Sequence, residues 1–225
     1  MVLKAVRNSL VDQVYTYVLS QIQSGELRPG HRLNIEEIAQ DFGVSRTPVR
    51  EAINRLTENG FVEMNYNSSP CIAQLQPKQA LDLVEANARL FDLLFDEFLL
   101  FGIDKEMVDE LDLVVEQQRH FDRDNDLEKF QQASCQFHFT LISYAKNGII
   151  KSFLENTQRQ LNLLMLMVQV SADSRKNSII DHGRIIDRLR AGDICSAKEL
   201  MDTHNLSAME ACKGIWDTYD ECTLA

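Results

Sequence analysis

The sequence lacks the features of a membrane protein and of a disulfide-stabilised protein. Its 225 residues contain no run of about 18 uncharged apolar residues, the length that a membrane-spanning helix needs. The first ten residues have no apolar stretch of signal-peptide length. The five cysteines are odd in number and form no Cys-x-x-Cys pair, which argues against a disulfide framework and a cysteine-ligated zinc site. We therefore expect a cytoplasmic protein with no membrane contact, whose thiols are reduced and mostly buried.

Positive charge is also scarce. The net charge is −11, which is unusual for a protein that binds nucleic acid. Residues 1–75 have a balance of only −1, however, and the remaining residues have a balance of −10. Since salt screens charges beyond about 8 Å, an acidic second half can coexist with a locally basic contact face in the first. We place a domain boundary after Leu75, which gives domains of residues 1–75 and 76–225.

Two short helices are predicted at the start of the first domain. Apolar residues recur at helical spacing over residues 10–23, and glycine-containing breaks follow this segment. Asn34 is the expected N-cap of the next helix, because Glu37 lies three residues further on, as in a capping box. Gly43 can adopt the left-handed conformation that ends a helix.

A third helix and a β-hairpin complete this domain. Ser45 is the expected N-cap of the third helix, with a side-chain oxygen that can accept a backbone N–H. Two extended runs follow, at residues 61–64 and 71–75, and a polar turn at residues 65–69 separates them. Helix, glycine turn, helix and hairpin together make a winged helix-turn-helix, whose second helix enters the major groove of DNA by its N-terminal end.

The residues at that N-terminal end suit contact with DNA. Arg46 and Arg50 lie four residues apart and therefore project from one face of the helix. Arginine can bind guanine edges in a bidentate manner and can bind phosphates. The hydroxyls of Ser45 and Thr47, with the free N–H groups of the first turn, suit phosphate oxygens. On spacing alone, contact with DNA and a pair of merely solvated arginines remain equally open.

Beyond Pro77 the pattern predicts helices only. The first of them carries an apolar stripe that includes Val84, Phe91 and Phe95, as a helix in a bundle does. We therefore expect a mostly α fold, with an antiparallel all-α bundle of six or seven helices behind the winged helix-turn-helix. The predicted helices are 77–101, 104–122, 126–145, 148–172, 176–190 and 194–217.

Residues 10–75 resemble the N-terminal domain of the GntR family of regulators. The strings that carry the resemblance are Gly25–Leu33, Ile38-Ala39, Gly43–Ala52, Arg55-Leu56 and Gly60–Val62. The resemblance implies a homodimer that binds double-stranded operator DNA. It implies that Arg46 and Arg50 contact DNA, and that Ser45 and Thr47 bind the DNA backbone or base edges.

Two positions depart from the family pattern. The wing of the family often carries Arg-Gly at its tip, and the matching pair here is Ser68-Ser69. Some members carry a DNA-contacting arginine early in the helix that follows Asn34, where this chain has Glu36. A carboxylate at that point repels phosphate, so this contact is absent or replaced.

Residues 80–215 resemble, more loosely, the helical ligand-binding domain of FadR-type members, called FCD. The strings are Phe137-His138, Asn147, His182 with Ile185-Ile186, Gly192-Asp193 with Ala197, and Met201 with His204. Six helices rather than seven favour the smaller, VanR-like version. The resemblance implies that the domain binds a small-molecule effector. Our hypothesis is a small organic acid, whose binding sets the spacing of two DNA-binding domains.

Many FCD domains hold a metal with three histidines and one aspartate. The matching histidines are His138, His182 and His204, and Ser134 stands in place of the aspartate. Three imidazoles can hold a divalent ion such as zinc or nickel and leave positions open for an anionic ligand. Without the resemblance, the three histidines are better explained as separate, hydrogen-bonded and partly buried residues. Asn87 stands where an arginine of the subgroup pairs with a ligand carboxylate, and Arg89 is close by.

Two other functions remain open. A metal-dependent hydrolase or lyase could use three histidines and a water, but no HExxH pair stands out and the first 75 residues would have no role. Alternatively, the protein is a DNA-binding regulator whose sensor has lost its ligand, as Ser134 suggests. A cavity filled by side chains would favour that alternative.

Overall fold

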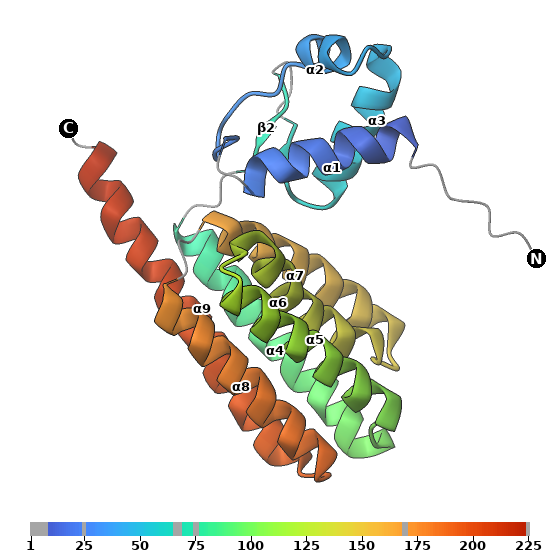
Figure 1. The fold of residues 1–225 in the computed structure, drawn as a ribbon, viewed down its shortest axis with the longest axis vertical. Helices are drawn as coiled ribbons and strands as arrows, with labels where there is room; N and C mark the ends of the chain where they lie inside the picture. Colours follow the sequence, from blue (N-terminus) through green and yellow to red (C-terminus); the bar gives the residue numbers. More distant parts are fainter. Residues whose placement is uncertain (1–8, 24–25, 65–68, 74–76, 168–170, 224–225) are drawn as a thin grey trace, which may run out of the picture. The chain divides into compact units, whose positions relative to one another are not determined.

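The computed structural model describes residues 9–23, 26–64, 69–73, 77–167 and 171–223 and divides into two compact units, Met1–Gln74 and Leu75–Ala225 (Figure 1). The first unit contains α1 (Leu10–Gln23), α2 (Ile35–Asp41), α3 (Arg46–Glu58) and a hairpin of β1 (Val62–Glu63) and β2 (Cys71–Ile72). The expected winged helix-turn-helix is confirmed. The turn at residues 65–68, with Ser68, lies outside the described residues.

Side-chain caps explain where two of these helices begin. Ser9 and Asp12 exchange backbone-to-side-chain hydrogen bonds at the start of α1. Asn34 Oδ1 accepts hydrogen bonds from the N–H groups of Glu36 and Glu37, as its N-cap position predicts.

The cap predicted for α3 is wrong in one detail. Ser45 occupies the N-cap position with an extended backbone, but its hydroxyl makes no cap hydrogen bond. The third helical residue is Pro48, which has no N–H to donate, so one of the two usual donors is missing. The exposed hydroxyl of Ser45 is therefore available to form a hydrogen bond with another group.

The core of the first unit orients α3. Val14 and Val18 of α1 are buried, and α1 packs against α3. Val49, Ile53 and Leu56 form the buried face of α3. Because these positions recur every three or four residues, the opposite face of α3 is exposed along its length.

Six helices make up the described part of the second unit, as expected for the smaller version of the bundle. Figure 1 shows α4 to α9 as long helices packed side by side. Their bounds are α4 Pro77–Phe101, α5 Lys105–Arg123, α6 Leu127–Ser143, α7 Gly148–Met167, α8 Ala172–Arg190 and α9 Ile194–Thr223. Gly102, Asn125 and Gly192 have positive φ at the connections. No helix in the described ranges is both long and apolar enough for a membrane span.

One boundary between helices differs from the prediction. The sequence pattern placed a helix over residues 148–172 and the next from residue 176. Helix α7 instead ends at Met167, and α8 begins at Ala172. The Ser171 hydroxyl accepts a hydrogen bond from the N–H of Ser174, so this cap starts α8 one turn earlier than its apolar spacing indicates.

The core of the bundle runs through α4, α5, α6, α8 and α9, with Leu154 of α7. The predicted stripe of α4 is buried at Val84, Phe91, Phe95 and Phe98. The central cluster adds, from the other helices, Met107, Leu111, Phe137, Leu141, Leu154, Ile185, Leu189, Ala197 and Met201. The polar residues that interrupt these stripes identify the site described next.

Candidate functional site

The N-terminal end of α3 presents the four residues predicted to contact DNA. Ser45, Arg46, Thr47 and Arg50 are all exposed, whereas Val49 between them is fully buried. Neither arginine is used in the core of its unit. The arrangement leaves two guanidinium groups and two hydroxyls on the helix end that a major groove accepts.

Glu36 lies beside this end of α3. Its carboxylate pairs with the Arg46 guanidinium at 2.9 Å, and both side chains are exposed. An exposed pair of this kind contributes little stability, about 0–1 kcal/mol. A phosphate can therefore replace the carboxylate as the partner of Arg46 at small cost.

A third arginine belongs to this surface and was missed as a candidate contact in the sequence analysis. Arg32 lines the same shallow depression as Arg46 and Arg50, together with Ser69. The backbone of Arg32 pairs with that of Cys71, so the segment adds an edge to the hairpin. Arg32 lies in the Gly25–Leu33 string that carries the family resemblance, but only the hairpin pairing places it beside α3.

In the second unit, three helices bring His138, His182 and His204 together. His182 lies four and seven residues before the buried Ile186 and Leu189 on α8. His204 lies three and seven residues after the buried Met201 and Ala197 on α9. Each histidine thus continues the core face of its helix, and packing of the helices makes the three meet.

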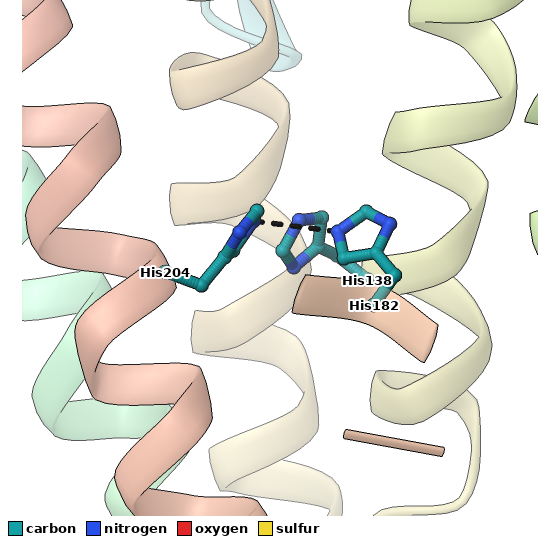
Figure 2. A group of neighbouring side chains, drawn as sticks. All are labelled: His138, His182 and His204. Carbon is teal, nitrogen blue, oxygen red and sulfur yellow. Dashed lines mark hydrogen bonds between the residues drawn. The ribbon is translucent and has the colours of Figure 1, made fainter. Parts of the chain in front are cut away.

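Figure 2 shows the three rings pointing toward one another. Their nearest ring nitrogens all lie within 4.8 Å of one another. The Nε2 atoms of His182 and His204 are 3.3 Å apart. The His182 ring also stacks on Phe137, with ring centroids 3.8 Å apart. His138 and His182 are buried and His204 is partly buried.

Two further side chains orient the rings. Gln118 Oε1 lies 2.9 Å from His182 Nδ1, and Asp181 Oδ2 lies 3.7 Å from His204 Nδ1. Both oxygens favour a proton on the adjacent Nδ1, which leaves a lone pair on each Nε2. Sequence analysis missed both residues, although Gln118 is a polar residue on the otherwise apolar stripe of α5.

These observations fit a divalent metal ion. Two Nε2 lone pairs that face each other at 3.3 Å repel unless a proton or a cation lies between them. Zinc–nitrogen bonds of about 2.0–2.1 Å in a tetrahedral site give nitrogen separations of about 3.3 Å. His138 Nδ1 is buried and has no hydrogen-bond partner among the described residues.

Burial keeps two of the histidines uncharged. Desolvation, with a smaller effect from His204, lowers the pKa of His138 to about 3. Desolvation, again with the neighbouring histidines, lowers the pKa of His182 well below its ordinary value. A metal ligand must be a neutral imidazole, so both rings stay available for coordination well below neutral pH.

The same pKa shifts predict that acid destabilises the metal-free protein. The unfolded chain takes up protons on these histidines near pH 6.5, whereas the folded chain does not until about pH 3 at His138. The free energy of unfolding should therefore fall below pH 6.5, by up to about 1.4 kcal/mol per pH unit for each histidine. Urea unfolding with a chelator at pH 7.5, 6.5 and 5.5 measures this slope.

A matched pair of variants assigns that slope. His138→Gln should reduce the slope, because glutamine does not titrate. Leu141→Ala on the same helix should lower stability at every pH and leave the slope unchanged, because Leu141 is buried but carries no titratable group. Equal slopes in the wild type and the His138→Gln variant would refute the assignment.

A cavity of about 370 Å³ opens beside the histidines, within the range of about 300–1,000 Å³ typical of ligand pockets. His138, His204, Ser134 and Asn87 all line it. Arg89 does not line it: its side chain is 76% exposed and faces Asp92 at 3.6 Å. The side chains of the described residues leave this cavity open, so the observation that would favour a lost ligand is not found among them.

The thiols differ from the expectation that they are mostly buried. Cys71 and Cys135 are half-buried and Cys195 is exposed, and none of the three forms a disulfide. Cys135 lines the cavity, and burial of its thiol raises the pKa to about 12, which makes it a poor nucleophile. The side chains of Cys212 and Cys222 lie outside the described residues.

The first unit is a winged helix-turn-helix whose α3 carries exposed arginines, and it is joined to a helical bundle that contains a cavity. This combination defines a transcriptional regulator. Two family models match the chain: the bacterial regulatory proteins of the gntR family over residues 10–69, and the FCD domain over residues 102–207. The chain belongs to the GntR family, and its second unit is an FCD domain.

Relatives and solved structures agree with this assignment. The chain is 24% identical to an uncharacterized HTH-type transcriptional regulator, YdhC, of Bacillus subtilis, over 85% of this chain and 86% of that protein. It is 29% identical to the Nta operon transcriptional regulator of Aminobacter aminovorans, over 77% and 81% of the two chains. A GntR-type structure from Rhodococcus matches the fold with a TM-score of 0.76 at 21% identity, over 91% and 97%. These likenesses indicate a regulator of transcription.

Proposed function

We propose that this regulator binds its operator as a homodimer and responds to a small organic acid in the FCD cavity, through a divalent ion such as zinc or nickel. The observation that carries the proposal is the meeting of three histidine rings at the wall of an open cavity. His138, His182 and His204 would hold the ion, while Gln118 and Asp181 orient two of the rings. A bound divalent ion supplies positive charge and coordination positions that the histidines do not fill.

On the DNA side, each residue of the exposed α3 end has a distinct role. Arg46 and Arg50 enter the major groove, where they bind base edges or phosphates. Ser45 and Thr47 bind the phosphate backbone and fix the register of the helix. Since one helix-turn-helix makes few contacts, two copies are needed for tight and specific binding.

An exposed apolar patch supports the homodimer. Leu93 and Leu100 of α4 are 45% and 77% exposed, and Ile149 and Phe153 of α7 are 70% and 58% exposed. Leu93 and Leu100 flank Glu97, whose carboxylate accepts the N–H groups of Lys146 and Asn147 just before α7. Leu93 and Leu100 therefore lie on the side of α4 that meets the start of α7, the helix on which Ile149 and Phe153 are exposed. A patch of this kind on one face is typical of a protein interface.

Replacing Phe153 with glutamate should separate the dimer. The substitution places a charge in the apolar patch, where burial against a second copy would be costly. We expect the mass of one chain instead of two in light scattering, and operator affinity lower by roughly 100-fold because two linked contacts become one. Leu113→Glu on α5 is the matched control, since Leu113 is 67% exposed and lies outside the patch. A dimeric Phe153→Glu variant would contradict this interface.

The function as a whole is tested by selecting duplexes from random-sequence DNA with the full chain. We expect enrichment of a two-fold symmetric site whose half-sites are about 34–36 Å apart, or a multiple of this distance. The affinity should fall steeply as salt rises, because binding to phosphates releases counterions. Failure to enrich any sequence, with affinity indifferent to salt, would rule out operator binding.

A further inference from the structure

The cavity beside the histidines is lined by an unusual set of polar groups. Six amide side chains line it, namely Asn87, Gln131, Gln158, Asn162, Asn177 and Asn205. Several serine hydroxyls, including that of Ser134, add to them. No lysine or arginine is among the described residues that line it.

Away from the histidines, the charge of the described lining is therefore neutral or negative. Asp181 contributes a carboxylate, and the amide and hydroxyl side chains contribute no charge. Among the described lining residues, a carboxylate ligand has no cationic side chain to meet away from the histidines. Asn87, which lines the cavity, is uncharged and cannot neutralise an anion.

The amide groups are instead positioned to bind hydroxyl groups. Asn205 is 8% exposed, and its buried Nδ2 has no hydrogen-bond partner among the described residues. Asn87 donates from Nδ2 to Thr157 Oγ1 at 2.9 Å, which fixes the amide and leaves its oxygen as an acceptor. Gln158 donates to Asn162 Oδ1 at 3.0 Å and likewise keeps its own oxygen.

A set of fixed donors and acceptors of this kind matches a ligand that both donates and accepts. A hydroxyl does both, whereas a carboxylate only accepts and an alkyl chain does neither. Phe130 and Leu161 also line the cavity and can pack on the C–H groups between hydroxyls. An unpartnered buried donor such as Asn205 Nδ2 is costly, so a ligand hydroxyl that reaches it contributes to affinity.

We propose that the effector is a small polyhydroxy monocarboxylic acid, with its single carboxylate at the histidines and its hydroxyl groups along the amide wall. This inference rests on the proposed function, since it keeps an acid effector at the histidine centre. It adds that the cavity selects its effector by the hydroxyl groups of the ligand. Dicarboxylates and unsubstituted alkanoic acids are excluded as preferred ligands.

The test uses calorimetry on the full-length, zinc-loaded protein with probes of matched length. The probes are aldonic acids of four to six carbons, the alkanoic acids of the same lengths, and the corresponding polyols. We expect at least one aldonic acid to bind about tenfold or more tightly than its alkanoic counterpart, because the site's polar groups stay unpaired with the latter. An alkanoic acid that binds as tightly as every aldonic acid would overturn the inference.

Variants separate this inference from the proposed function. Asn205→Leu should weaken the aldonic acid by about threefold or more and leave the alkanoic acid unchanged. Asn156→Leu, at an exposed position of α7 outside the lining, is the control. If alkanoic acids bind only with zinc and hydroxyls add nothing, the proposed function stands and the inference fails. If polyols bind as well as aldonic acids without zinc, the acid effector fails and the hydroxyl preference stands.

Discussion

Replacing both Arg46 and Arg50 with alanine should lower operator affinity by about 100-fold or more. Each arginine that binds a base or phosphate contributes about 1–3 kcal/mol, and both project from the same exposed end of α3. The fold should survive, because neither side chain belongs to the core that Val49, Ile53 and Leu56 form. Fluorescence anisotropy with the selected duplex measures the affinity, and circular dichroism confirms the helical content.

The single variants separate reading of sequence from attraction to phosphate. An arginine that binds a guanine edge should relax the preference at one base pair when it is replaced, whereas one that binds phosphate should weaken all sequences alike and reduce the salt slope by about one. Arg184→Ala removes the same charge at an exposed position of the FCD domain and is the control. Undiminished operator affinity in the double variant would show that the exposed end of α3 is not the DNA-binding surface.

Most of the fold could be predicted, because each element carries its own local signal. The helix bounds of α1 and α4 follow from apolar spacing and from the breaks that flank them. The start of α8 could not be found in the same way, because Ser171 caps a first turn that has little apolar character. A cap depends on a local hydrogen bond, and the spacing of apolar residues does not reveal it.

The site was predictable only in part. The three histidines could be named from the resemblance, but their meeting depends on the packing of α6, α8 and α9, which no local pattern contains. Gln118 and Asp181 were missed because a polar residue on a buried stripe has no meaning until its partner is known. Arg89 was considered for its charge, yet it lies on the exposed side of α4. Helical phase separates it from Asn87, two positions away, which is buried.

Removal of the histidines should abolish metal binding. Purified without a histidine tag and loaded with zinc or nickel, the wild type should hold one ion per chain by elemental analysis. His204→Ala should lower the affinity by about 100-fold or more, since the loss of an orienting partner alone costs about 10–100-fold. A metal at 100 times the wild-type dissociation constant should stabilise the wild type by about 2.7 kcal/mol and the variant by about 0.4 kcal/mol or less. Urea unfolding with and without metal measures this difference.

The controls address folding and adventitious binding. His120→Ala and His31→Ala remove exposed histidines and should leave the metal content unchanged. His204 is chosen for the single variant because it is only partly buried, so its truncation disturbs the core less than truncation of His182. An unaltered metal content after all three central histidines are changed to alanine would eliminate the histidine centre.

Asp181→Asn gives the sharpest version of this experiment. The substitution keeps the shape of the side chain but removes the charge that favours a proton on His204 Nδ1, 3.7 Å away. Since Ser134 supplies no carboxylate, Asp181 is the one acidic residue among the described residues that line the cavity beside the histidines. We expect zinc affinity about tenfold weaker, with the metal-free stability at pH 7 nearly unchanged. An equal loss of metal-free stability would mean that Asp181 holds α8 to α9 and does not tune the ligand.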